Sequence, residues 1–266
     1  MKQILKQLLY DAKRKVNYLK YKDVLPNNPM HDDIYIVEFP KSGITWLQHI
    51  LGNIELGLAD KKESITFYNH HKYMPDVHQL RGMHVHRVLE RTFIKSHAEY
   101  NPYYYFVIYL VRNPFDVMVS YYNFMCSHGY KNSFNDFVRS ESYGVLNWKA
   151  HLKSWNYKKV IAQRIHFIRY EDLIENPFKE VLNLYVNLGV EISEKAIEKA
   201  IEKSCLANMS KSESHYKVYN PNYNMSFVGK SGKKRRSDIM TKEIEDYIFD
   251  SCFEEIKYFY SDLLLK

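Results

Sequence analysis

A short loop, Pro40-Lys41-Ser42-Gly43, separates an apolar run at residues 34–39 from a segment of helical periodicity at residues 45–58. Unpaired backbone N–H groups and the positive end of the helix dipole make the start of a helix an anion site. The lysine and serine add a charge and a hydroxyl donor that suit a phosphate. The segment therefore predicts a phosphate-binding loop between a buried strand and a helix.

The same order recurs after a second apolar run, residues 106–111. Arg112 comes next, Asn113 has the type of a helix cap, and Pro114 suits the first helical position. A guanidinium offers a planar fork to phosphate oxygens, and a hydroxyl in the first turns of a helix adds a directed donor. We therefore predict that Arg112 and Ser120 contribute to an anion site.

His97 follows Lys95 and Ser96 at the end of a shorter apolar run, residues 92–95. A single histidine at a strand end is more often structural than catalytic. Its position between two phosphate motifs favours the catalytic interpretation. The loop at Lys41 lacks the Gly-Lys-Ser/Thr order by which nucleotide triphosphatases hold magnesium, because here the lysine comes first.

The first loop, extended to Trp46, resembles the 5′-phosphosulfate loop of the cytosolic-type sulfotransferases, Pro-Lys-Ser-Gly-Thr-Thr-Trp, and departs from it only at Ile44. Further resemblances follow in the family's order. Residues 92–97 resemble its Lys-Thr/Ser-His strand, residues 111–122 its 3′-phosphate motif, and residues 167–177 its Tyr-Glu-Asp strand end. The preceding helix is matched at three positions: Trp148, His151 and Trp155. The resemblance runs from residue 35 to residue 177.

The resemblance implies 3′-phosphoadenosine 5′-phosphosulfate as the donor, adenosine 3′,5′-bisphosphate as the product, and no metal. Five residues would hold the donor's 5′ side, with the indole stacked on adenine: Lys41, Ser42, Gly43, Thr45 and Trp46. Five further residues are implied contacts of the 3′-phosphate, the adenine edge and the remaining nucleotide: Arg112, Ser120, Tyr170, Ser204 and Leu206.

The implied reaction is in-line transfer of a sulfuryl group to an acceptor hydroxyl or amine. It needs a base for the acceptor proton and positive charge beside the leaving phosphate. The resemblance makes His97 the base, and gives Lys41, with Lys95 nearby, the charge-stabilising role.

Residues 209–240 are polar, contain Pro221, Gly229 and Gly232, and show no clear periodicity, which predicts either a functional lid or a disordered insertion. We expect a basic lid loop. In the family this region carries Arg-Lys-Gly and then Gly-Asp-Trp-Lys over the 3′-phosphate. Here Lys230 alone survives of the first motif, and five basic residues cluster nearby: Lys230, Lys233, Lys234, Arg235 and Arg236. The family's dimerisation motif is poorly kept, so the oligomeric state stays open.

Apolar strands that alternate with helices predict a single α/β domain over residues 1–266, with a central parallel sheet flanked by helices. Helices are expected at 45–58, from 114 toward 126, and at 145–155, 177–188, 193–204 and 241–263, with a further strand at 165–169. Residues 1–25 are expected to form an N-terminal amphipathic helix that packs on the domain.

The composition is that of an ordinary globular protein, with 45% hydrophobic and 26% charged residues among 266. A net charge of +7 favours anionic ligands. Three scattered cysteines suggest a reducing compartment, and we expect a cytoplasmic enzyme without a membrane span. Two alternatives stay open: a P-loop-like small-molecule kinase, and a nucleic-acid-binding module that uses the basic loop.

The acceptor is expected to be a small molecule or a glycan, and no stable nucleic-acid complex is expected. Several aromatic residues suggest an aromatic acceptor pocket near His97: Phe67, Tyr68, Tyr73, His84 and Tyr103 to Tyr105. Such pockets accept phenols, sterols and sugars alike.

Overall fold

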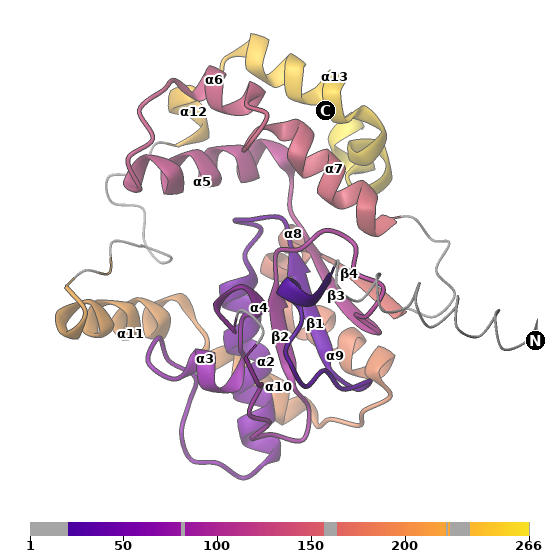
Figure 1. Cartoon of the computed structure of the whole chain (residues 1–266), viewed down its shortest axis with the longest axis vertical. Coiled ribbons are helices and arrows are strands. Elements are labelled where there is room, and N and C mark those ends of the chain that lie inside the picture. The colour runs from indigo at the N-terminus through magenta and orange to yellow at the C-terminus, as the bar shows by residue number, and fades with distance from the viewer. Residues whose placement is uncertain (1–20, 81–82, 157–163, 222, 224–234, 266) are drawn as a thin grey trace, which may run out of the picture.

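The computed structural model describes residues 21–80, 83–156, 164–221, 223 and 235–265 (Figure 1). Its centre is a parallel sheet of four strands in the order β2-β1-β3-β4. Their bounds are β1 Ile34–Glu38, β2 Phe93–Ser96, β3 Phe106–Val111 and β4 Arg164–Arg169. In the register, Ile34 lies between Phe93 and Phe106, and Phe106 lies beside Arg164. The predicted parallel sheet is confirmed.

Alternate residues of the central strands enter two different cores, because successive side chains of a strand point to opposite faces. Tyr35 and Val37 of β1 belong to one buried cluster, whereas Ile34 and Ile36 belong to the other. Every residue of β1 is buried, as expected for a strand covered on both faces. The fold is therefore a three-layer α/β/α arrangement.

One face of the sheet is covered by α2 Ile44–Leu58, α9 Pro177–Leu188 and α10 Glu194–Lys203. The other is covered by α5 Pro114–Ser127, α6 Phe134–Arg139, α7 Val145–Asn156 and α13 Lys242–Phe259, which form the upper layer in Figure 1. Trp148 and Trp155 are each 1% exposed and are therefore core residues. The Asn113 side chain accepts a hydrogen bond from Phe115 N, as its predicted role as a cap requires.

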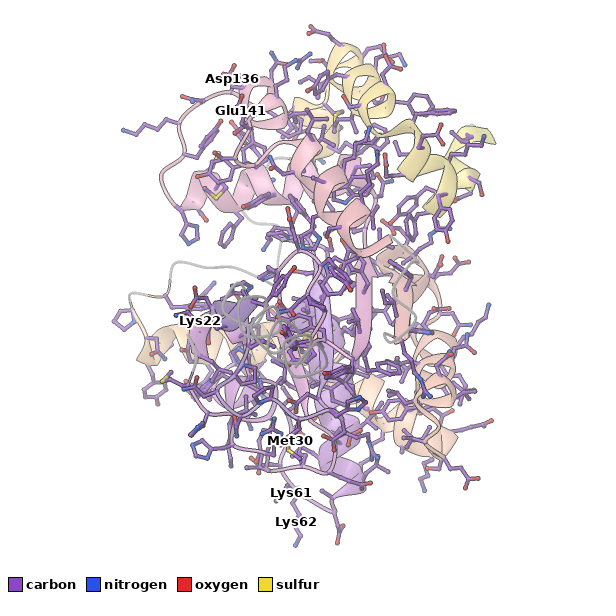
Figure 2. All side chains as sticks on the ribbon, turned by 45° about the vertical axis from the view of Figure 1, so that its right-hand side comes forward. Lys22, Met30, Lys61, Lys62, Asp136 and Glu141 are labelled. Atoms are coloured by element: carbon purple, nitrogen blue, oxygen red, sulfur yellow. The ribbon has the colours of Figure 1, made fainter. Side chains whose placement is uncertain are left out.

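The remaining elements are shorter or lie at the periphery. They are α3 His70–Tyr73, α4 Val77–Leu80, α8 Tyr170–Glu175, α11 Leu206–Tyr219, α12 Arg236–Ile239, and the 3-10 helices η1 Lys22–Val24 and η2 Ser261–Leu265. Figure 2 shows Lys61 and Lys62 pointing outward at one end of the molecule, and Asp136 and Glu141 lying at the other. No helix among the described residues is both long and apolar enough to cross a membrane.

The expectation of a loop from residue 209 is wrong for residues 209–219, which belong to helix α11. Only Met209 and Glu213 of this helix are buried, so its sequence carries little amphipathic signal. Contacts from distant residues hold it: Phe67 N donates to Ser212 Oγ at 3.1 Å, and Tyr68 Oη donates to His215 O at 2.9 Å. The expected 241–263 helix ends at Phe259, with a non-helical residue at Cys252.

Two further expectations fall partly or wholly outside the described residues. Residues 1–20 of the expected N-terminal helix are outside them, and in the described part that follows Tyr21 is helical and Lys22–Val24 form a 3-10 turn. Lys230 and two of its basic neighbours, Lys233 and Lys234, also lie outside the described ranges.

Candidate active site

The predicted phosphate loops meet at the carboxyl edge of the sheet, where β1 and β3 lie side by side. The chain leaves β1 toward β2 and returns to β3 on the other side, so the two loops diverge at a topological switch point, where open α/β sheets bind ligands. Arg112 Nη1 donates to the carbonyl oxygen of Lys41 at 3.1 Å and ties the loops together. Sequence segments 71 residues apart thus form one site.

The first loop reaches helix α2 through left-handed backbone. Lys41 has φ 76° and Gly43 has φ 110°, the first of which is unusual for a residue with a side chain. A Cβ atom at Gly43 would overlap the Tyr170 ring, so glycine serves both the backbone angle and the close approach. The Arg112 guanidinium also lies over this ring, 4.5 Å from the Tyr170 centroid.

Arg112 retains hydrogen-bonding capacity at this site. Its Nε atom is buried and has no hydrogen-bond partner among the described residues. Buried donors are normally paired, so an unpaired guanidinium N–H beside a helix N-terminus suits an anionic ligand. Ser120 is half-buried on α5, while Thr45 is half-buried in the first turn of α2.

Ser42 and Ser204 have partners inside the protein. Ser42 Oγ donates to Phe39 O at 2.9 Å and so braces the loop. Ser204 is fully buried, and its hydroxyl accepts a hydrogen bond from Asn53 Nδ2 at 3.0 Å. The carbonyl oxygen of Ser204 accepts from Trp46 Nε1 at 3.0 Å, which fixes the half-buried indole. The Leu206 side chain is mostly exposed, at 70%.

His97 follows β2 at the same edge, and its ring is partly accessible, at 26%. Its Nδ1 atom lies 3.2 Å from the carbonyl oxygen of Glu38. Because a carbonyl can only accept, Nδ1 carries a proton, and Nε2 holds the lone pair of the neutral ring. Burial lowers the pKa of His97, and the nearby Lys95 charge lowers it further, so the ring is neutral near pH 7.

The main chain around His97 is held from helix α7 and from α4. His151 Nε2 lies 3.2 Å from His97 O, and the Trp155 indole donates to Ala98 O at 2.9 Å. His97 N donates to His78 Nε2 at 2.9 Å. His151 and Trp155 of α7 therefore hold the backbone of residues 97 and 98 in place.

Two lysines were predicted to stabilise charge, and they have different surroundings. Lys95 Nζ forms an ion pair with Asp76 Oδ2 at 3.1 Å, and this pairing lowers the Asp76 pKa against the opposing effect of burial. Lys41 Nζ lies 4.8 Å from the centroid of the Phe124 ring of α5. Within the described ranges, no three His, Cys, Asp or Glu side chains gather as a metal site would require.

Glu38 is the residue of this site that sequence reasoning missed. It ends β1, is 2% exposed, and accepts a hydrogen bond at Oε2 from Ile44 N, 2.8 Å away, in the first turn of α2. Its Oε1 lies 3.9 Å from His97 Nδ1. Burial raises the pKa of Glu38 to about 7 despite three nearby cations. A carboxylate directly before a phosphate loop was the available signal.

The expected aromatic pocket beside His97 does not form from the Tyr103 to Tyr105 run. Tyr104 is buried and stacks on Tyr35, with ring centroids 3.6 Å apart. Tyr105 precedes β3, so it lies at the amino edge of the sheet, where it stacks on His31 at 4.1 Å. The expectation failed because the run forms the turn before β3, where Tyr104 enters the core and Tyr105 lies at the amino edge.

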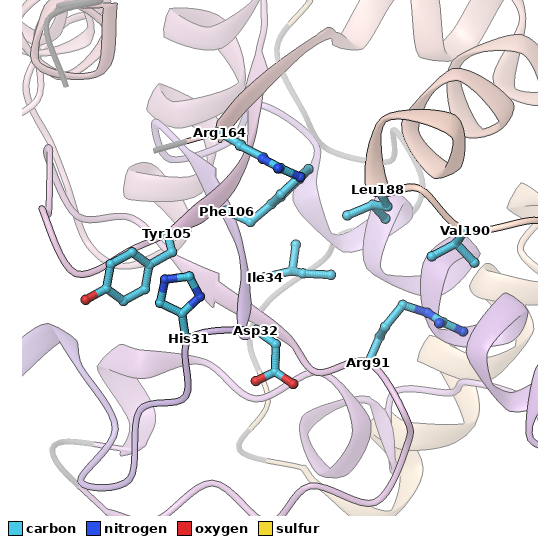
Figure 3. A pocket seen from close by; sticks show the side chains of 9 residues that line it. All are labelled: His31, Asp32, Ile34, Arg91, Tyr105, Phe106, Arg164, Leu188 and Val190. Carbon is cyan, nitrogen blue, oxygen red and sulfur yellow. The ribbon is translucent and has the colours of Figure 1, made fainter. Parts of the chain in front are cut away.

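A separate pocket of about 610 Å³ lies at that amino edge (Figure 3). Its lining includes the first residues of three strands and two arginines: His31, Asp32, Ile34, Arg91, Tyr105, Phe106, Arg164, Leu188 and Val190. None of the predicted donor or base residues lines it.

Comparison with known protein families agrees with this arrangement. Residues 31–260 match the family model described as "Sulfotransferase domain". The chain therefore belongs to the sulfotransferase domain family.

Its curated relatives include Sulfotransferase 1E1 from Bos taurus, 33% identical over 170 residues, and from Homo sapiens, 33% identical over 175 residues. These matches cover 58% of this chain and 57% or 58% of the relatives, so the matched part is a little over half of each relative.

Solved structures share the fold. A mouse sulfotransferase, SULT7A1, complexed with PAP, has a TM-score of 0.60 at 17% identity, with 93% of this chain and 90% of that chain covered. Retinol dehydratase in complex with androsterone and inactive cofactor PAP has a TM-score of 0.62 at 17% identity, with 91% and 85% covered. The predicted α/β architecture with a central parallel sheet is confirmed.

Proposed function

We propose that the protein transfers a sulfuryl group from 3′-phosphoadenosine 5′-phosphosulfate to a hydroxyl or amine of a small molecule or glycan. One observation carries the proposal. The hydrogen bond from Arg112 to Lys41 O joins two anion-binding loops at the switch point, and His97 lies at the same edge with Nδ1 held by Glu38 O. This arrangement supports a cationic donor site with a neutral histidine base beside it.

The residues present fit a nucleotide that carries two phosphate groups. The N-terminus of α2 faces the first loop, and the unpartnered Arg112 Nε belongs to the second. Lys41, Ser42, Gly43, Thr45 and Trp46 would hold the 5′ side, and Arg112 with Ser120 the 3′-phosphate. Tyr170 would meet the base. Ser204 would act mainly through Trp46, because its side chain is fully buried and its carbonyl oxygen accepts from the Trp46 indole. Leu206 and Lys230 complete the proposed donor contacts.

The bound donor supplies an activated sulfuryl group on a phosphate leaving group. His97 Nε2 accepts the proton of the acceptor hydroxyl, and the bond from Nδ1 to Glu38 O keeps Nε2 directed away from the strand. Lys41 places positive charge at the loop where negative charge develops. Lys95, which Asp76 holds in place, adds to the local potential and keeps the His97 ring neutral.

Two observations support the acceptor class. Retinol dehydratase has been crystallised with androsterone and with retinol, both apolar alcohols. Phe67 is buried beside His49 and Met209 near α2, and would contribute an apolar wall. Glycans are also among the proposed acceptors. We also propose a cytoplasmic location, because the chain has three cysteines, an odd number that cannot pair completely.

Calorimetry with adenosine 3′,5′-bisphosphate in the presence of a chelator tests the donor assignment. We expect binding without metal, and weak competition by ATP, which lacks the 3′-phosphate. Transfer from labelled donor to a panel of phenols, sterols and sugars then tests the reaction. Lack of binding, or binding that only magnesium restores, would favour the kinase alternative and overturn the assignment.

A further inference from the structure

Glu38 places a carboxyl group where an anion-binding loop should exclude one. Oε2 lies 2.8 Å from Ile44 N, which belongs to the first turn of a 15-residue helix. The side chain is 2% exposed, so water does not screen it. A phosphate on the N-terminal amides of α2 would therefore share one buried site with this carboxyl group.

Two negative groups that share a buried site do not both remain ionised, because one of them binds a proton. The surroundings of the two groups decide which of them binds the proton. Phosphate esters are stronger acids than a buried carboxyl group. In the free protein the pKa of Glu38 is already raised to about 7. The cations near it would be drawn to the incoming phosphates, which removes part of what stabilises the carboxylate.

Charged and titratable groups from several neighbouring elements surround Glu38. Lys95 of β2 is the strongest cation in lowering its pKa, followed by Lys41 of the loop and Arg112 after β3. His97 is neutral, and Tyr109 of β3 and Tyr170 of α8 have their pKa values raised by burial first and by Glu38 as a later contribution. Glu38 is therefore the acidic group among them that titrates near neutral pH.

We propose that Glu38 takes up one proton from solvent when the anionic nucleotide binds, and that its neutral carboxyl group then lies beneath the loop as a hydrogen-bonding support. This inference rests on the proposed function, since it needs a phosphate at the start of α2. It makes Glu38 a residue of the donor site and links donor affinity to pH.

Calorimetry with adenosine 3′,5′-bisphosphate at pH 8, in two buffers of different ionisation enthalpy, counts the protons bound. We expect close to one proton for the wild type and none attributable to this position in Glu38→Gln. Between about pH 7.5 and 9, where the phosphates are fully ionised, wild-type affinity should fall by about 20-fold, as expected for one group with a pKa near 7. The affinity of Glu38→Gln should stay nearly constant.

Glu55→Gln is the matched control, because Glu55, which belongs to α2, is another buried carboxylate whose pKa is raised, mainly by burial. It accepts from Arg91 Nε at 3.0 Å and Tyr185 Oη at 2.7 Å, toward the other end of the helix. This variant should keep the proton uptake, and thermal melts confirm that each variant is folded.

Wild-type binding without proton uptake, or an equal pH dependence in wild type and Glu38→Gln, overturns the inference and leaves the donor assignment standing. Absence of wild-type binding at every pH overturns the proposed function, and the inference falls with it. A lack of proton uptake by the wild type overturns the inference even if a variant does not fold.

Discussion

The amino edge and the carboxyl edge of the sheet both carry charged side chains, but the two edges differ in how these charges are paired. At the amino edge, Arg87 pairs with the buried Asp33 at 2.7 Å, and Arg91 pairs with the buried Glu55 at 3.0 Å. At the carboxyl edge, Arg112 Nε is buried without a partner among the described residues, and the pKa of the buried Glu38 is raised to about 7.

The loop at the carboxyl edge also has unusual backbone geometry. Left-handed residues Lys41 and Gly43 occur in the loop at the carboxyl edge. Such conformations cost free energy and persist where the surrounding structure enforces them. The difference teaches that paired charge marks the supporting edge of this fold, whereas incompletely paired charge marks the edge where we propose the donor site.

The largest expected effect tests whether the carboxyl edge performs chemistry. His97→Ala should lower kcat by about 10²–10⁴-fold, the usual share of a general base, while affinity for adenosine 3′,5′-bisphosphate stays nearly constant. Turnover should be measured beside a thermal melt. A folded variant that binds the nucleotide and keeps a near-normal kcat would show that His97 is structural, and would leave the donor site intact.

The next prediction compares one arginine from each edge. Arg91→Met should lower the free energy of unfolding by about 3 kcal/mol, because Glu55 stays buried without its cation. Nucleotide affinity should not change. Arg112→Met should weaken adenosine 3′,5′-bisphosphate binding by about 1.5–3 kcal/mol, the usual contribution of hydrogen bonds to a charged group.

The stability of Arg112→Met should change by less than about 1 kcal/mol, because that guanidinium makes one hydrogen bond to Lys41 O and a ring contact with Tyr170. Denaturant unfolding and calorimetry on both variants provide the two readouts. The same pattern of effects in both variants would remove the distinction between the edges.

The smallest effect concerns two glycines in and before α2. Gly43→Ala should cost about 1–3 kcal/mol and weaken nucleotide binding, because φ is 110° and the new Cβ would overlap the Tyr170 ring. Gly57→Ala is the control, since a Cβ there meets no atom within 4 Å. It should be neutral, or stabilise by up to about 1 kcal/mol. Equal stability losses would show that the strain at Gly43 is unimportant.

Much of the fold was predictable because its signals are local. The apolar runs located the strands within about one or two residues, the usual precision of such boundaries, and Asn113 with Pro114 marked the start of α5. Helix α11 was not predictable in this way, because few of its residues are buried and distant residues such as Phe67 and Tyr68 hold it.

The sequence predicted which residues lie together at the candidate site, but not the side-chain partners of those residues. The loop residues, Arg112 and His97 all lie at one edge, as parallel strands require. Side-chain partners depend on tertiary packing, so the Asp76 partner of Lys95 and the Asn53 partner of Ser204 could not be read from spacing. Glu38 was overlooked because it ends an otherwise apolar strand and was counted as part of the sheet.

The strand order also has a kinetic consequence. Paired strands lie far apart along the chain, since Ile34 pairs with Phe93 and Phe106, and Phe106 pairs with Arg164. Non-local parallel pairing is slow, because long loops must close before the contacts that stabilise them can form. The two anion loops and the histidine should therefore come together only in the last stages of refolding, so recovered nucleotide binding would report completion of the sheet, after helix formation has ended.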